Sequence, residues 1–175
     1  MVENYAEWSA SLAECFIIVR FLNRWLPFRY NNHKNIVTGI LFILLAVDNI
    51  VLSQKERTEN LSVLIMLLLI LLYSFAFQRG RIYEKILEVL IPALTIFPIN
   101  GIILYSVSFI THQDVNMLRG SGGELRMLVL FFSKFAFFSV SEILIKVKKK
   151  DTSSLKSFQW LLQILCFVIP FILPT

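Results

Sequence analysis

The stretch LRMLVLFFSKFAFFSVSEILIKVKKK, residues 125–150, decides how the rest of the chain is understood. A helix needs ~20 mostly apolar residues to cross the ~30 Å hydrocarbon core of a bilayer, and residues 125–146 supply that length. Lys134 lies near the middle of this stretch, where a charge is costly and usually has a function or a partner. The lysines that end it are typical of the cytoplasmic end of a membrane helix.

The composition extends this interpretation to the whole chain of 175 residues. It is 57% hydrophobic and 17% charged, against about 45–50% and about 25% in soluble domains. Because the apolar residues come in blocks, we predict an all-α polytopic transmembrane helix bundle, one domain over residues 1–175 with no soluble domain. The predicted spans, about six, are residues 5–26, 35–52, 61–78, 86–110, 125–146 and 158–173.

The basic residues predict an orientation. Of the seventeen Lys and Arg, eleven lie in the first, third and fifth connections, and three lie in the second and fourth. The positive-inside rule therefore predicts that the three basic connections are cytoplasmic and that the N-terminus lies outside the plasma membrane. The same rule accounts for the net charge of +5, so we expect a lipid bilayer as partner and no nucleic acid.

Charged residues inside the spans are the first candidates for function, because intramembrane ions usually face the bundle interior and pair. We expect Lys134 to pair with Glu14 or Asp48, and Arg20 with Glu142 or Glu88. Such pairs hold a bundle in register, or they line a ligand or ion pathway. The predicted members of intramembrane ion pairs, besides Lys134, are Glu14, Arg20, Glu88 and Glu142.

The fourth span carries the strongest irregularity, with Pro98, Asn100 and Gly101 close together. A proline removes a backbone donor and kinks a helix, so Pro98 and Gly101 predict a hinge. The alternative is that both are ordinary in membrane helices and that Gly101 allows close packing. The residues that we predict to contact a signal are Asp48, Asn100, Arg126 and Lys134.

Catalytic motifs are absent from the sequence. His33 and His112 fall on opposite sides of the predicted membrane, and no HExxH, GxSxG or phosphate-binding GK[ST] motif occurs. Cys15 and Cys166 lie in apolar segments and are predicted to be free thiols. We expect no metal, no cofactor and no enzymatic activity in the chain as given.

Three segments resemble the membrane sensor region of GHKL-type sensor histidine kinases, the accessory-gene-regulator and VirS-like quorum-sensing receptors. They are YSFAFQRGRIYEKIL, the opening stretch, and SFQWLLQILCFVIPFILP. The residues that carry the resemblance are Phe77, Gly80, Arg81, Lys85, Ile86, Leu87, Arg126, Lys134 and Trp160.

The resemblance implies two-component signal transduction, an extracellular signal such as a short peptide, and a homodimer. The phosphoacceptor histidine, the asparagine box and the ATP lid of the family do not occur in this sequence, so we expect the kinase to follow a truncated sensor region. Two alternatives stay open. One is the membrane subunit of a vitamin or small-molecule importer, and the other is a structural membrane partner.

Overall fold

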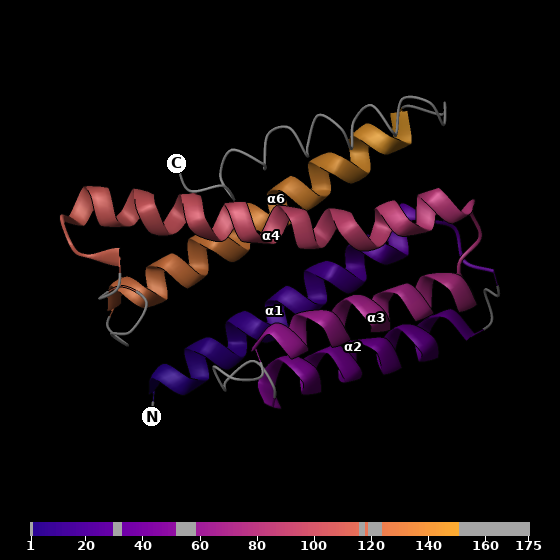
Figure 1. The fold of residues 1–175 in the computed structure, drawn as a ribbon, viewed down its shortest axis with the longest axis horizontal. Helices are drawn as coiled ribbons and strands as arrows, with labels where there is room; N and C mark the ends of the chain where they lie inside the picture. The colour runs from indigo at the N-terminus through magenta and orange to yellow at the C-terminus, as the bar shows by residue number, and fades with distance from the viewer. Residues whose placement is uncertain (1, 30–32, 52–58, 116–117, 119–123, 151–175) are drawn as a thin grey trace. The chain divides into compact units, whose positions relative to one another are not determined.

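The computed structural model describes residues 2–29, 33–51, 59–115, 118 and 124–150 (Figure 1). The named helices are α1 (Val2–Trp25), α2 (Lys34–Val51), α3 (Glu59–Phe77), α4 (Ile82–Thr111) and α6 (Glu124–Lys150). Within these residues the chain forms no strand beyond one isolated bridge. The all-α prediction is confirmed for this part of the chain, and the predicted span 158–173 lies outside it.

Each named helix covers one predicted span and differs from it at the ends. The largest differences are in α4, which begins at Ile82 rather than residue 86, and in α6, which continues through its lysines to Lys150. Glu84 explains the early start of α4, because its Oε2 accepts a hydrogen bond of 2.9 Å from the backbone N–H of Arg81, just before the helix. This carboxylate satisfies a donor that the first turn leaves open.

Three of the described helices, α2, α4 and α6, are long and apolar enough to cross a membrane. The apolar part of α3, Leu61–Phe77, is shorter. The helix α1 does not meet the same criterion, and its charged residues, among them Glu14 and Arg20, explain this. By length and composition the described residues therefore contain fewer crossing helices than the six that the sequence predicted.

Besides their buried apolar cores, these helices expose many large apolar side chains, whereas the outer face of a helix in a soluble protein is polar. The exposed side chains of α2 include Ile36, Ile40, Ile43 and Val47, whereas Asp48 on the same helix is only 5% exposed. In α6, Phe131 and Phe135 are exposed. Apolar surface outside and polar groups inside suit a lipid environment, and this supports membrane association.

The chain divides into two compact units, each with its own packed residues. Unit 2 is Ser11–Ala93, and unit 1 is Met1–Ala10 with Leu94–Thr175. In unit 2, α2 and α3 lie side by side (Figure 1). Helix α1 presents the buried residues Cys15, Ile18 and Leu22 at helical spacing, and buried Leu26 follows directly after the helix.

In unit 1 the packed residues are Leu104, Leu118 and Val129, with Ile103, Val107, Val115 and Leu125 around them. The helix α4 ends at Thr111, and the remaining residues of this cluster follow it in the chain. His112 follows with a φ of 54°, a left-handed conformation that commonly terminates helices. Both units therefore have an apolar core to which α4 contributes.

Candidate functional site

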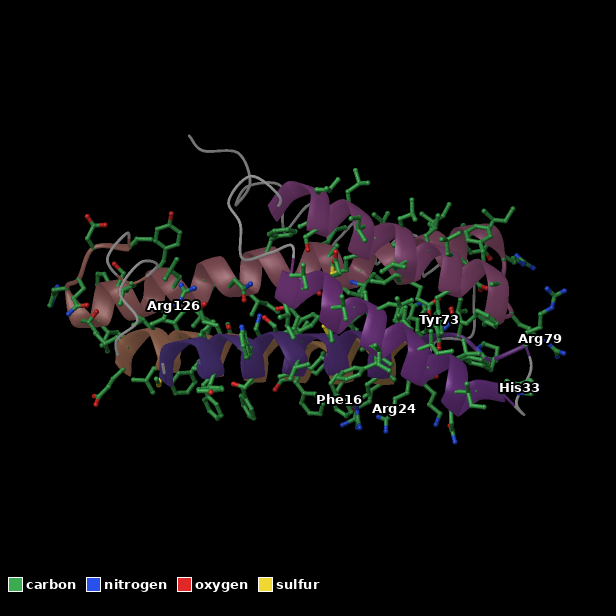
Figure 2. All side chains as sticks on the ribbon, turned by 90° about the horizontal axis from the view of Figure 1, so that it is seen from below. Phe16, Arg24, His33, Tyr73, Arg79 and Arg126 are labelled. Carbon is green, nitrogen blue, oxygen red and sulfur yellow. The ribbon has the colours of Figure 1, made fainter. Side chains whose placement is uncertain are left out.

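Two predicted cytoplasmic connections are bonded to each other at one end of unit 2. The backbone N–H of Arg29 donates to the carbonyl of Phe77 (2.7 Å), and that of Arg79 donates to the carbonyl of Pro27 (2.8 Å). These bonds form a short antiparallel bridge between the segments that follow α1 and α3. Figure 2 shows His33 and Arg79 at this end of the unit. The basic residues of both connections are thereby gathered on one side.

Beneath the bridge lies a buried polar cluster, here called the Gln78 network: the side chains of Ser74, Gln78 and Glu88, and the carbonyl of Leu22. Gln78 Nε2 donates to Leu22 O and to Glu88 Oε1, both at 2.8 Å. Ser74 Oγ donates to Glu88 Oε2 at 2.7 Å. None of the three side chains is more than 1% exposed. Leu22 lies in the last turn of α1, whose carbonyls lack helical partners, so Gln78 caps α1 from another segment.

The turn between α3 and α4 is held by further contacts. Lys85 Nζ donates to the carbonyl of Phe75 in the last turn of α3 (3.3 Å) and lies 5.1 Å from the centre of the Phe75 ring. A Cβ on Gly80 would lie 3.0 Å from Glu84 Oε2 and 3.1 Å from Leu26 Cδ2. The turn therefore packs too closely for a side chain at position 80 unless its neighbours move.

A second cluster, the Tyr73 network, joins α1, α2 and α3 through Asn23, Thr38 and Tyr73. The Tyr73 hydroxyl donates to Asn23 Oδ1 at 2.8 Å, and Thr38 Oγ1 donates to the same oxygen at 3.3 Å. Tyr73 is 4% exposed and is labelled in Figure 2. Together with the Gln78 network, it connects all the helical segments of unit 2 through side-chain hydrogen bonds.

The predicted signal residue Asp48 lies in the same unit, in α2. Its Oδ2 accepts a hydrogen bond of 3.1 Å from Ser62 Oγ on α3. Its Oδ1 is buried and has no hydrogen-bond partner among the described residues. Asp48 thus joins two neighbouring helices.

The predicted signal residue Arg126 lies in unit 1, in the first turn of α6 (Figure 2). Its Nη2 is 3.4 Å from Glu7 Oε1, and its Nη1 is 3.5 Å from the carbonyl of Leu118. Its Nε is buried and has no acceptor within the described parts of the chain. The side chain is 26% exposed and that of Glu7 is 51% exposed.

The other two predicted signal residues, Asn100 and Lys134, are half-buried in α4 and α6. Both belong to unit 1 with Arg126, whereas Asp48 belongs to unit 2. The four predicted residues therefore do not form one cluster within a single unit.

The predicted pairs of Lys134 with Glu14 or Asp48, and of Arg20 with Glu142, would join residues of different units, and they stay predictions. So does the alternative pair of Arg20 with Glu88. Glu88 itself lies in the Gln78 network, where the donors given above come from Ser74 and Gln78.

The hinge predicted at Pro98 and Gly101 falls within α4, which is helical from Ile82 to Thr111. Neither residue ends the helix. A Cβ on Gly101 would meet no atom of the described residues within 4 Å. Both the hinge and the alternative role of Gly101 in close packing stay predictions.

Chemically, the described residues offer two hydrogen-bonding networks and the Arg126 guanidinium with a carboxylate beside it. They contain no group of three or more His, Cys, Asp or Glu side chains that could hold a metal ion. Cys15 is buried and not in a disulfide, and it accepts a long contact of 3.7 Å from Asn49 Nδ2. No family model, curated protein or solved structure matches this chain.

Several residues of these networks were not predicted from the sequence, namely Glu7, Asn23, Thr38, Ser62, Tyr73, Ser74 and Gln78. Most are neutral and polar, whereas the residues predicted within the spans were mainly charged. Gln78 gave a detectable signal, because it is a strongly polar residue directly at the end of an apolar helix. Ser62 and Ser74 gave none, since serine is common in membrane helices.

Proposed function

We propose that this chain is the signal-sensing membrane region of a GHKL-type sensor histidine kinase, with an extracellular N-terminus and a signal site toward the outer side. Six crossings, including residues 158–173, belong to this proposal. The observation that carries it is the agreement between the residues of the resemblance and the contacts of the α3–α4 turn. Phe77 and Lys85 are residues of the resemblance that make hydrogen bonds there, and Gly80, a third, lies where an added Cβ would crowd its neighbours.

The orientation is supported by the bridge between the first and third connections. Loops that lie on the same side of a membrane can bond to one another, and these two do so through Arg29 and Arg79. Both loops are rich in Lys and Arg, which favours the cytoplasmic side. The bridge therefore agrees with an N-terminus outside.

The Gln78 network gives the proposal a physical means of transmission. In a setting of low dielectric, the three side-chain hydrogen bonds of this network favour one helix arrangement over others, because a shift that breaks them leaves buried groups without these partners. The network is not fully bonded, since Gln78 Oε1 is buried with no hydrogen-bond partner among the described residues. A signal that binds one arrangement better shifts the equilibrium by its differential affinity. We propose that signal binding shifts α4 relative to α1 and α3 and so changes the bonds of Glu88 and Gln78.

The first test is to read the genomic DNA downstream of the codon for Thr175. We expect an open frame that encodes a further crossing, a phosphoacceptor histidine and a GHKL-type ATPase domain. A stop codon at this point with no kinase-like frame beyond it would contradict the proposal.

The second test uses that full-length protein in nanodiscs. Autophosphorylation is measured with labelled ATP, with and without concentrated culture supernatant of the source organism. We expect the supernatant to change the rate, and Gln78→Leu to alter this response more than Gln113→Leu, a substitution at an exposed position. Uptake of a labelled small molecule by cells, with no effect on phosphorylation, would favour the importer instead.

A further inference from the structure

The starting observation is that the guanidinium of Arg126 is poorly engaged. Its two contacts, to Glu7 Oε1 and to the carbonyl of Leu118, are 3.4 and 3.5 Å long. Charge-assisted hydrogen bonds of well-formed pairs are about 2.7–2.9 Å long. Nε is buried and has no acceptor among the described residues. Among the described residues, the Nε edge of the guanidinium meets no acceptor and its other edge makes only these two long contacts.

Glu7 does not supply that anion well. It approaches through a single oxygen and is half-exposed, and ion pairs of this kind contribute little to stability. Arginine prefers to bind a carboxylate through two parallel hydrogen bonds. Glu7 is therefore an internal carboxylate that an incoming carboxylate with better geometry can displace.

The surroundings indicate the rest of the ligand. The carbonyl that Arg126 contacts belongs to Leu118, which is fully buried in the apolar cluster with Leu104 and Val129. Near Glu7, Tyr5 and Trp8 are exposed to 63% and 39% and contact each other edge to face. The two groups that the guanidinium contacts thus belong to an apolar cluster, through Leu118, and to a helix turn with exposed aromatic rings, through Glu7.

We propose that Arg126 binds the carboxylate of an amphiphilic ligand, a carboxylate joined to an apolar group, and that Glu7 occupies the site in its absence. The identity of the ligand rests on the proposed function: the ligand would be the extracellular signal, bound through its carboxylate. The binding chemistry itself depends only on this chain.

The test measures the binding of N-acetyl-leucine to the chain in phosphatidylcholine nanodiscs by ligand-observed NMR. N-acetyl-leucinamide, which lacks the charge, is the matched probe. We expect the carboxylate to bind and the amide to bind at least about tenfold more weakly, since a charged hydrogen-bonded pair is lost. Arg126→Gln is expected to remove the difference between the two probes, and Arg126→Lys to reduce it.

The decisive comparison is between two acids close to Arg126. We expect Glu7→Gln to tighten binding of N-acetyl-leucine by up to about fivefold, because it removes a weak competitor. Glu124→Gln removes the same charge from an exposed residue in the first turn of α6, and we expect a smaller effect from it. Weaker binding in Glu7→Gln, or equal effects of the two variants, would overturn the proposal that Glu7 occupies the site in the absence of ligand.

Equal binding of the two probes would overturn the carboxylate site itself. Nanodiscs that contain phosphatidylglycerol provide a further arm. If N-acetyl-leucine is displaced in proportion to this lipid, the guanidinium binds lipid phosphate and the proposal fails. A kinase frame without carboxylate binding would refute only the site, and carboxylate binding without a kinase frame would refute only the sensor.

Discussion

Replacing Gln78 with leucine tests the polar connection between α1, α3 and α4. The wild-type amide makes two hydrogen bonds of 2.8 Å, to Leu22 O and Glu88 Oε1. Hydrogen bonds between membrane helices contribute about 0.6 kcal/mol on average and up to about 1.7 kcal/mol each. The variant also leaves two buried acceptors without this donor, at about 1–3 kcal/mol for such a group. We expect the free energy of unfolding to fall by roughly 2–4 kcal/mol.

The assay is reversible unfolding in mixed micelles by titration with dodecyl sulfate, followed by circular dichroism. Gln113→Leu, at an exposed position, is the matched control and should change stability by less than about 0.5 kcal/mol. Because Gln78 and Glu88 are bonded, the double variant Gln78→Leu with Glu88→Leu should cost less than the sum of the single variants. Equal losses in Gln78→Leu and Gln113→Leu, with no coupling to Glu88, would refute the reasoning.

The same unfolding assay checks three other substitutions. Gly101→Ala should stabilise the chain by about 0.5–1 kcal/mol, because alanine favours helix and its Cβ meets no atom of the described residues within 4 Å; a loss would indicate packing at this position. Gly80→Ala should destabilise by about 1–2 kcal/mol, since its Cβ would crowd Glu84 and Leu26; an unchanged midpoint would mean that both side chains move away freely. Asp48→Asn should stay within about 0.5 kcal/mol because it still accepts from Ser62, whereas Asp48→Leu should lose about 1–2 kcal/mol. Equal losses in the two Asp48 variants would mean that the charge matters rather than the hydrogen bond.

The positions of the helices could be predicted because apolar blocks of bilayer length are long and clearly bounded. The helix α2 differs from its predicted span by one residue at each end. The ends of α4 and α6 were less predictable, because they depend on local contacts. The carboxylate of Glu84 caps α4 and so allows it to begin earlier than predicted, and α6 stays helical through its lysines to Lys150.

The candidate site was predictable only in part. Burial of Asp48 and of Glu88 follows from the cost of a charge in lipid. Their hydrogen-bond partners could not be predicted from this cost, because the rotation of α3 about its axis determines that Ser62 and Ser74 face the two carboxylates. The partner of Arg126 could not be predicted either, since Glu7 is 119 residues away in the chain and lies outside any motif.

The number of membrane crossings also depends on more than composition. Because of its charged residues, helix α1 does not meet the hydropathy criterion for a membrane-crossing helix. Its apolar residues Ile18 and Leu22 are nevertheless fully buried. A helix of this kind can cross a membrane when its polar side chains face other helices. A hydropathy criterion therefore leaves α1 out, whereas the prediction of six spans counted it as one of the apolar blocks.

The most direct test of the account is the side of the membrane on which each connection lies. Single cysteines at Arg81 and at His112, both exposed, are introduced into a chain with Cys15→Ser and Cys166→Ser. Intact cells are then treated with a membrane-impermeant maleimide. We predict labelling of His112→Cys in intact cells, and of Arg81→Cys only after the membrane is opened. The reverse pattern, or labelling of both positions from outside, would contradict the orientation on which the sensor proposal depends.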